Sequence, residues 1–491
     1  MIIKYGEWAP DLSEYHVGGG ECRLTVAANV VALSDGYEPI NVSGTSGAGA
    51  LGARCQGAFS SIYGGATQDF LGDDTDLWTV TDYQGTPTAV SSATAAYTTN
   101  AGDYWDFTQY GRQVLAVNGG TSTAAQIQGW ALGSSTAFAD ISGSPPAAAT
   151  ISVVRQQVVC GNTYDATDGA VPYRIRWSGI GNHEAWSVSA ATQADFQDLN
   201  SYGGKVQRVL GGATGKILQE TAVTVMSPAD AGLAFRFDEG RGIGTPAPRS
   251  AVQHAGSVYF LGWDGFYRWN PGSGEIIPIG RNKVDNTVLS ALTTASLVDV
   301  IGCVDYVHQA IVWLYGVDLS SGSGANNCVM YSIKADRWTS FATTTTFVGS
   351  PTHVEYMYTS YINGSGTPYF VDTDHQVVGL EGTDFASTLI EVVPIELTPQ
   401  RRTLVKGVRP LYRLNASGSA TTNALNIDSS ENVLDSVRTL TTGSYNSFTG
   451  AFQFRNSGRY HYFRQAVKPG VSGKAKLFGL DIFDYSPLGR Q

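Results

Sequence analysis

"SVYFLGWDGFYRWNPGSGEIIPIG", residues 257–280, consists of three short apolar runs separated by two turn sequences. Aromatic and β-branched residues favour strands, whereas Asp-Gly and Asn-Pro-Gly favour tight turns. The stretch therefore predicts three antiparallel strands, with Asp264-Gly265 as a type I′ hairpin turn. Trp263 beside Asp264 would also suit stacking on a sugar, so the stretch is either one unit of an all-β protein or a binding site. The regular strand and turn spacing favours the first interpretation.

The same order of strand, turn and strand recurs elsewhere in the chain. It is found in residues 112–141, 156–188, 309–341 and 367–380. Units that repeat at about 40–50 residues and each supply a strand meander are typical of β-propeller blades. The sequence therefore predicts an all-β protein in which residues 21–387 form a propeller of six or seven blades. Helical spacing of apolar residues is clear only in residues 284–300.

The charge balance changes near residue 388. Residues 388–491 contain 13 Lys and Arg against 7 Asp and Glu, a net charge of +6, whereas residues 1–387 contain 18 against 35, a net charge of −17. Such asymmetry indicates regions with different partners. We therefore expect an N-terminal arm (1–20), the propeller (21–387) and a C-terminal β-sandwich-like domain (388–491). The acidic body argues against a protein that reads DNA sequence, because affinity for nucleic acid comes largely from cations.

Motifs for catalysis or cofactor binding are missing from the sequence. It has no H-E-x-x-H, no phosphate-binding loop and no G-x-S-x-G, and its seven histidines and five cysteines lack metal-ligand spacing. Asp73, Asp74 and Asp76 could hold Ca²⁺, but without the remaining ligands of a calcium loop a solvated turn is favoured. We expect no catalytic residues, no cofactor and no metal site.

The sequence also lacks the signals of membrane or secreted proteins. No apolar run is long enough to span a bilayer, and the first residues do not have the charged and apolar regions of a signal peptide. The sequence therefore predicts synthesis in a cytoplasm and no membrane insertion.

Several strings resemble the tail nozzle (tail hub, or DNA-stabilisation) proteins of short-tailed bacteriophages. The resemblance is most specific in the middle of the chain and continues near the N-terminus, in "RQQVVCGN" (155–162), "YRIRWSGIGNHEAW" (173–186), "FDEGRGIGTPAPRSAVQHAGSVYFLGWDGFYRW" (237–269), "IPIGRNKVD" (277–285), "AIVWLY" (310–315), "EWAPDLSEY" (7–15) and "ANVVALSDGYEPI" (28–40).

This resemblance implies a structural protein of the virion tail that forms a homohexameric ring. The ring would extend the channel of the portal and the head-to-tail adaptor protein, retain the packaged DNA and conduct it at ejection without sequence recognition. Tail fibre or spike proteins and needle or plug proteins are its further implied partners.

Ten charged residues are candidates for contacts in such a ring. The first group would line the channel or an interface between subunits: Arg174, Arg176, Asp238, Glu239, Arg241 and Arg249. For the two arginines of the 173–186 string, an ion pair on the blade surface is the alternative. Arg241 and Arg249 would either meet DNA or pair with Asp238 and Glu239. The second group, in the basic region, would face an acidic neighbouring ring: Arg401, Arg402, Lys406 and Arg409.

Two other functions remain open at this stage. The first is a tail-associated glycan-binding or glycan-degrading propeller, in which exposed aromatic residues would serve as sugar platforms. The second is a kelch-like scaffold, which "YSIKADRWTSF" (331–341) suggests. That element would have to recur in every blade, and it is clear only once.

Overall fold

The computed structural model of the chain describes residues 1–13, 21–42, 49–82, 86–92, 97–120, 126–229, 234–240, 242–317, 324–343, 353–380, 385–414, 420–431, 439–469 and 475–488. The stretch at 257–280 forms three antiparallel strands, as predicted, and a short strand precedes them. These four strands are β21 (Val252–His254), β22 (Ser257–Leu261), β23 (Phe266–Asn270) and β24 (Glu275–Pro278).

The turn between β22 and β23 differs from the predicted type I′ turn. The N–H of Gly262 donates to the carbonyl of Gly265 at 2.8 Å, so Trp263 and Asp264 are the two central residues. A type I′ turn needs positive φ at both central positions, and neither residue has it. Gly265 has φ +148°, and a Cβ there would lie 2.2 Å from the Asp285 carboxylate. Glycine is therefore required at 265 for the close approach of that carboxylate, and not as the second central residue of the turn.

Four more sheets have the same four-stranded antiparallel meander. They consist of β5 (Gly57–Tyr63), β6 (Ala66–Gly72), β7 (Leu77–Val80) and β8 (Thr88–Ala89); β9 (Asp106–Tyr110), β10 (Gln113–Val117), β11 (Gln128–Ala131) and β12 (Ala139–Asp140); β13 (Ala147–Val154), β14 (Gln157–Asp165), β15 (Gly169–Trp177) and β16 (Asp195–Asp198); and β17 (Val206–Leu210), β18 (Gly215–Gln219), β19 (Val223–Pro228) and β20 (Phe235–Glu239).

Two further meanders complete the ring. One is β25 (Ile301–Asp305), β26 (Ala310–Tyr315), β27 (Asn327–Ser332) and β28 (Arg337–Ala342), which continues into a larger sheet. The other has three strands, β29 (Val354–Ser360), β30 (Thr367–Asp372) and β31 (Val377–Gly379).

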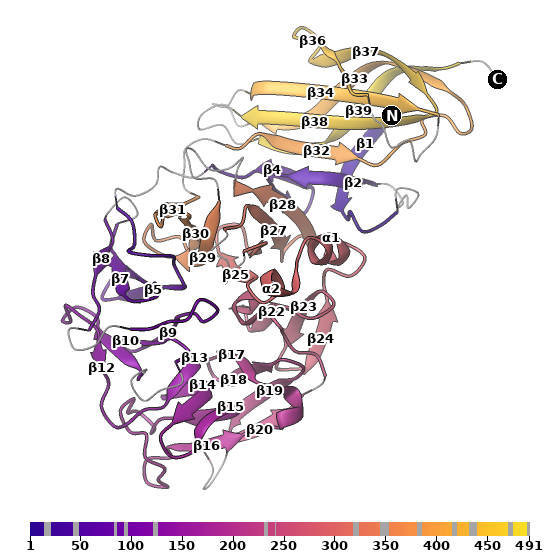
Figure 1. Cartoon of the computed structure of the whole chain (residues 1–491). Helices are drawn as coiled ribbons and strands as arrows, with labels where there is room; N and C mark the ends of the chain where they lie inside the picture. Colours follow the sequence, from indigo (N-terminus) through magenta and orange to yellow (C-terminus); the bar gives the residue numbers. More distant parts are fainter. Residues whose placement is uncertain are drawn as a thin grey trace.

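The first strands of neighbouring meanders contact one another around a common axis (Figure 1). β5, β9, β13 and β17 follow in order, the 3-10 helix Pro248–Ser250 connects β17 to β25, and β25, β29 and β5 close the ring. The described residues thus form a propeller of six separate small sheets plus the meander β25–β28, and we call each of these units a blade. The prediction of a propeller with six or seven blades is confirmed.

Helix is rare in the described ranges and occurs where the sequence predicts it. The apolar pattern of 284–300 forms two short helices, α1 (Asp285–Ser290) and α2 (Thr294–Leu297), which an irregular segment separates. The second helix begins with a capping box between Thr293 and Ser296. A short 3-10 turn is also present at Ser201–Gly203. No helix of the described ranges is long and apolar enough to cross a membrane.

Aromatic rings from neighbouring blades pack against one another in the core. The Phe266 ring centroid lies 4.7 Å from that of Trp313 and 5.1 Å from that of Trp338, and the two tryptophan rings are stacked at 5.5 Å. All three side chains are completely buried. Each buried aromatic side chain stabilises the fold by about 1.5–3 kcal/mol. The aromatics of 257–280 are therefore buried in the packing of the blades, except Trp263, which is exposed.

The rest of the large sheet folds into a two-layered sandwich at one end of the molecule (Figure 1). One layer has β32 (Thr388–Val392), β38 (Tyr460–Pro469), β34 (Ala420–Ser430) and β35 (Thr441–Thr442). The other has β1 (Ile2–Trp8), β39 (Ala475–Pro487), β33 (Thr403–Leu414), β37 (Ala451–Gly458) and β36 (Ser444–Asn446). Fully buried side chains of both layers fill the space between them, among them Leu425, Ile427, Val405, Leu480 and Ile482. The predicted C-terminal sandwich is therefore present.

The first residues belong to this sandwich, whereas we expected a separate N-terminal arm of residues 1–20. β1 pairs antiparallel with β39, and β2 (Glu21–Ala28) pairs with β1, with β32 and with the end of β28. The hairpin β3 (Val30–Leu33) and β4 (Gly36–Pro39) adjoins β39. Ile3 and Tyr5 are the physical reason, because their side chains are buried in the sandwich core. The expected boundary at 388 therefore does not separate two independent sheets.

Candidate interaction surfaces

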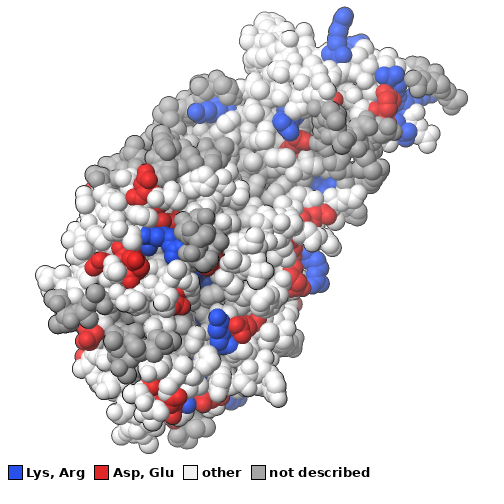
Figure 2. Space-filling view, viewed as in Figure 1, with Lys and Arg blue, Asp and Glu red and all other residues white. Residues whose placement is uncertain are grey.

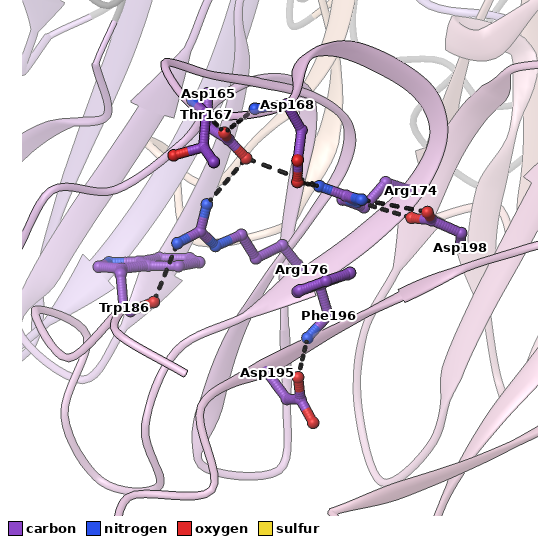
Figure 3. A network of polar contacts seen from close by, with 9 residues as sticks. All are labelled: Asp165, Thr167, Asp168, Arg174, Arg176, Trp186, Asp195, Phe196 and Asp198. Atoms are coloured by element: carbon purple, nitrogen blue, oxygen red, sulfur yellow. Dashed lines mark hydrogen bonds and ion pairs between the residues drawn. The ribbon is translucent and has the colours of Figure 1, made fainter. Parts of the chain in front are cut away.

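The first candidate pair, Arg174 and Arg176, lies in an ion-pair network on the blade β13–β16 (Figure 3). Arg174 stands opposite Asp198 of β16, and its Nε and Nη2 donate to the two Asp198 oxygens at 2.6 and 3.1 Å. Its Nη1 donates to Asp168 at 2.5 Å. The hydrogen bond with Asp198 is the main reason why the pKa of Arg174 is raised, although burial opposes it. The guanidinium thus joins the edge strand β16 and the β14–β15 turn to the middle of the blade.

Arg176 closes the other half of the network. Its Nη1 lies 3.2 Å from Asp165, and its Nη2 donates to the Trp186 carbonyl at 3.1 Å. Burial opposes ionisation of Asp165, yet hydrogen bonds from the N–H groups of Asp168 and Thr167 and the charge of Arg176 keep its pKa below the usual value. The side chains of Arg174 and Arg176 are 7% and 16% exposed. Both arginines therefore form intrachain ion pairs on the blade, which was the alternative interpretation.

Phe196 is an apolar side chain beside this network that was not among the predicted site residues. Phe196 is 39% exposed, and the Arg174 guanidinium lies over its ring at 4.1 Å from the centroid. The only sequence signal was an aromatic residue in the acidic string "QADFQDL" (193–199).

The other candidates of the first group lie apart from one another. Asp238 pairs with Arg236 at 2.7 Å on an exposed edge, beside a groove of about 530 Å³ between β20 and the β23–β24 turn. Only the backbone of Glu239 is described, at the end of β20, and Arg241 lies outside the described residues. Arg249 is buried near the propeller axis and pairs with Asp299 at 2.5 Å. Of the two alternatives for Arg249, pairing with Asp238 is not found, because Asp299 lies beside Arg249 in the fold, and contact with DNA stays a prediction.

The second group divides between an ion pair and a groove on the sandwich. Arg401 is exposed just before β33, and Arg402 pairs with Glu431 at 2.9 Å. Lys406 and Arg409 are exposed on β33, where Lys406 lines a groove of about 520 Å³. Arg409 lies 3.8 Å from Asp481, with its guanidinium 5.1 Å from the Phe483 ring centroid.

Two residues that the sequence analysis missed complete this groove. Arg455 of β37 and the half-exposed Phe483 of β39 line it together with Lys406. The Phe483 ring lies over Gly407, where an added Cβ would lie 2.6 Å from the ring. We call Lys406, Arg455 and Phe483, together with Arg409 beside the Phe483 ring, the basic groove; its lining also contains one carboxylate, Asp484. The charged residues of β33 were visible in the sequence, but the contribution of β37 and β39 depends on strand pairing.

The charge split between the two parts is smaller in the folded molecule than along the sequence. Residues 1–42, most of which form strands of the sandwich or adjoin them, contain 2 Lys and Arg against 6 Asp and Glu. Together with residues 388–491 this makes 15 against 13, a net charge of +2, and leaves −13 for residues 43–387. Figure 2 shows acidic and basic side chains interspersed over this face of the propeller. The sandwich as a whole is therefore only weakly positive, and an electrostatic contact on it depends on the local arrangement of its cations.

The acidic turn at 73–76 is built into the fold and is not solvated at its first residue. Asp73 is completely buried and accepts hydrogen bonds from the N–H groups of Ala53, Thr75 and Asp76 and from Trp78 Nε1, at 2.6–3.2 Å. Its oxygens are thus used by the turn. Within the described ranges, no three His, Cys, Asp or Glu side chains come together as metal ligands would.

Comparison with known proteins finds similarity at the level of structure alone. No protein-family model and no curated protein matches the sequence. An extracellular domain described as part of a hybrid two component system of B. thetaiotaomicron aligns with 85% of this chain at 7% identity and a TM-score of 0.46. The chain covers 48% of that structure, about half its length. A chain of the mitotic checkpoint complex aligns with 63% of this chain and is itself covered to 85%, at 11% identity and a TM-score of 0.37.

Proposed function

We propose that this chain is a structural subunit of the tail of a short-tailed bacteriophage. Six copies would form a ring, the nozzle, that extends the channel of the portal and adaptor, retains the packaged DNA and conducts it at ejection. The resemblance of residues 155–315 to nozzle proteins suggests this role, and the observation that carries it is the basic groove. An exposed cationic groove with an aromatic residue, on a domain at one end of an acidic body, suits attachment to an acidic neighbouring ring.

The propeller axis does not suit the path of DNA. The cavity at the axis has a volume of about 300 Å³ and is lined by side chains of the inner strands. This is the volume of a small-molecule pocket and not of a duplex. DNA would therefore pass through an opening between subunits, such as a closed ring of head-to-tail contacts creates.

Charge supports a conduit that does not hold DNA. Residues 43–387 have a net charge of −13, and non-specific affinity for DNA arises from cations that replace counterions on the phosphates. A channel wall formed by the propeller would repel phosphates and let the duplex slide. Retention of the genome would then depend on a closed gate or plug, and not on adhesion to the wall.

Assembly of the purified full-length chain with the adaptor ring tests the proposal. Mass photometry and symmetry analysis of electron micrographs should show a six-fold ring of this chain on the adaptor, and none on an adaptor whose acidic surface has been neutralised. A stable monomer that binds host-surface polysaccharide and ignores the adaptor would contradict the proposal. That result would favour the glycan-binding propeller, for which the exposed Trp263 and Tyr202 would be the first residues to test.

A further inference from the structure

The cavity at the propeller axis has a lining with one sign of charge. It is surrounded by residues of β5, β17, β21, β25 and β29. Its described lining contains two cationic side chains, Arg208 and Arg249, and no Asp or Glu. The nearby carboxylates, Asp106 and Asp299, each hold one arginine without lining the cavity.

Both arginines carry N–H donors that have no acceptor among the described residues. Arg249 pairs with Asp299 through Nη2, whereas its Nε and Nη1 have no hydrogen-bond partner in the described part of the chain. Its side chain is 3% exposed, and its guanidinium lies over the Tyr104 ring at 5.1 Å from the centroid. Arg208 pairs with Asp106 through Nη1 at 2.8 Å, and no described residue accepts from its Nε.

The carboxylates fix the arginines from outside the cavity. Asp106 accepts further hydrogen bonds from Thr150 Oγ1 at 2.7 Å and from the N–H of Ile151 at 2.9 Å, so its position does not depend on Arg208 alone. Gln253, also in the lining, accepts from Lys216 through Oε1 at 3.4 Å, which leaves its NH₂ group as a donor. Arg208, Arg249 and Gln253 thus present prearranged donors in a lining that is otherwise largely apolar.

Buried donors without acceptors are unfavourable, and planar guanidinium groups match the geometry of oxyanions. We propose that the axial cavity binds a small tetrahedral oxyanion, free phosphate, between Arg208 and Arg249. The ion supplies acceptors to the unpartnered N–H groups, and it joins β17, which carries Arg208, to the 3-10 helix Pro248–Ser250, which carries Arg249. This site is independent of the proposed role in the virion.

Binding to the isolated full-length protein tests the site. Titration calorimetry with inorganic phosphate, at constant ionic strength in chloride buffer, should give saturable binding to one site. The midpoint of thermal unfolding should rise by about 3–5 °C in saturating phosphate relative to chloride, as expected when a ligand binds only the folded state. No saturable binding and equal midpoints in the two salts would overturn the proposal, because water would then fill the cavity.

Matched lysine variants locate the site without removing charge. R249K and R208K keep a cation beside Asp299 and Asp106 but lose the guanidinium fork, so each should weaken phosphate binding at least tenfold. The control R236K, which changes the exposed ion pair with Asp238, should change the phosphate affinity less than twofold. If R249K does not fold, the phosphate affinity of R208K alone tests the location of the site. Phosphate affinity that is unchanged in R208K would place the ion elsewhere and overturn the site.

A competition experiment separates a free ion from a nucleic-acid phosphate. A short DNA duplex at equal phosphate concentration should not displace the bound phosphate, because a cavity of about 300 Å³ does not admit a duplex. Displacement by the duplex would overturn the assignment to a free ion.

Discussion

His461 ties the two layers of the sandwich together, and its protonation should open them. The imidazole is completely buried, with Nε2 2.8 Å from Thr403 Oγ1 of β33 and Nδ1 2.8 Å from Ser429 Oγ of β34. Burial lowers the pKa of His461 to about 4. In the unfolded chain the same group has a pKa of about 6.5. Because the folded value is the lower one, His461 favours the folded state fully above pH 6.5 and loses this contribution as the pH falls towards 4.

The size of the effect follows from the two pKa values. The difference of about 2.5 units corresponds to about 3 kcal/mol in total, of which about 2 kcal/mol is lost between pH 7.5 and pH 5. Glu355 acts in the opposite direction, because burial raises its pKa to about 7 and the folded state therefore binds its proton more readily. The pH dependence of the free energy of unfolding therefore combines several groups. The contribution of His461 is obtained from the difference between wild type and a variant in which this residue does not titrate.

His461→Gln keeps an amide that can bond to Thr403 and Ser429 but does not titrate. Hydrogen exchange, corrected for the intrinsic effect of pH, measures the free energy of opening of β38, with β22 as an internal control. Between pH 7.5 and pH 5, wild-type β38 should lose about 2 kcal/mol more than β38 of the variant, and β22 should respond equally in both. Parallel pH profiles of β38 in the two proteins would refute the neutral, buried imidazole as the source.

Three further predictions concern the groove, the acidic turn and DNA. The variant K406E/R409E/R455E should attach to the adjoining ring more than about tenfold more slowly than wild type at low salt, and the difference should shrink at high salt. Particles with this variant should lose their DNA and show emptied heads in electron micrographs. Full infectivity would show that the groove does not contact a neighbouring ring. The matched control reverses three exposed arginines of the propeller: R112E/R236E/R281E. Asp73→Ala removes the buried carboxylate that accepts four hydrogen bonds and should lower the free energy of unfolding by about 3 kcal/mol in denaturant titrations. A loss below about 1 kcal/mol would contradict the role of these hydrogen bonds. The free chain should bind duplex DNA no more tightly than about 10⁻⁴ M at physiological salt in anisotropy measurements, and tighter binding would argue against an acidic channel wall.

Local features of the fold were predictable because their causes are local. Strand runs such as 257–261 and 310–315, and the turns between them, are encoded by neighbouring residues, and meanders connect strands that follow one another in the chain. The repeat of these units was enough to predict a propeller. The type of the turn between β22 and β23 was not predictable from its own residues. The carboxylate of Asp285, twenty residues beyond Gly265, occupies the space beside that glycine.

Among the candidate site residues, the sequence indicated which were charged but not what they would meet. Lys406 and Arg409 were predictable as an exposed basic pair on one strand, whereas Arg455 and Phe483 join them only through pairing of β33 with β37 and β39. Arg249 resembled a channel residue in a glycine-rich loop, and its partner Asp299 lies fifty residues away in sequence.

The sequence by itself thus determined the all-β class, the blade repeat and the region of positive charge, because strand propensity, turn chemistry and formal charge reside in the residues themselves. Tertiary structure alone decided that Ile2–Trp8 pairs with Ala475–Pro487, that Arg455 and Phe483 join Lys406 in one groove, and that Arg208 and Arg249 line the same cavity at the propeller axis. Each of these features depends on contacts between segments that are distant in the sequence. Burial of the whole core selects which segments pair, and such pairing produces no pattern at a fixed spacing in the sequence.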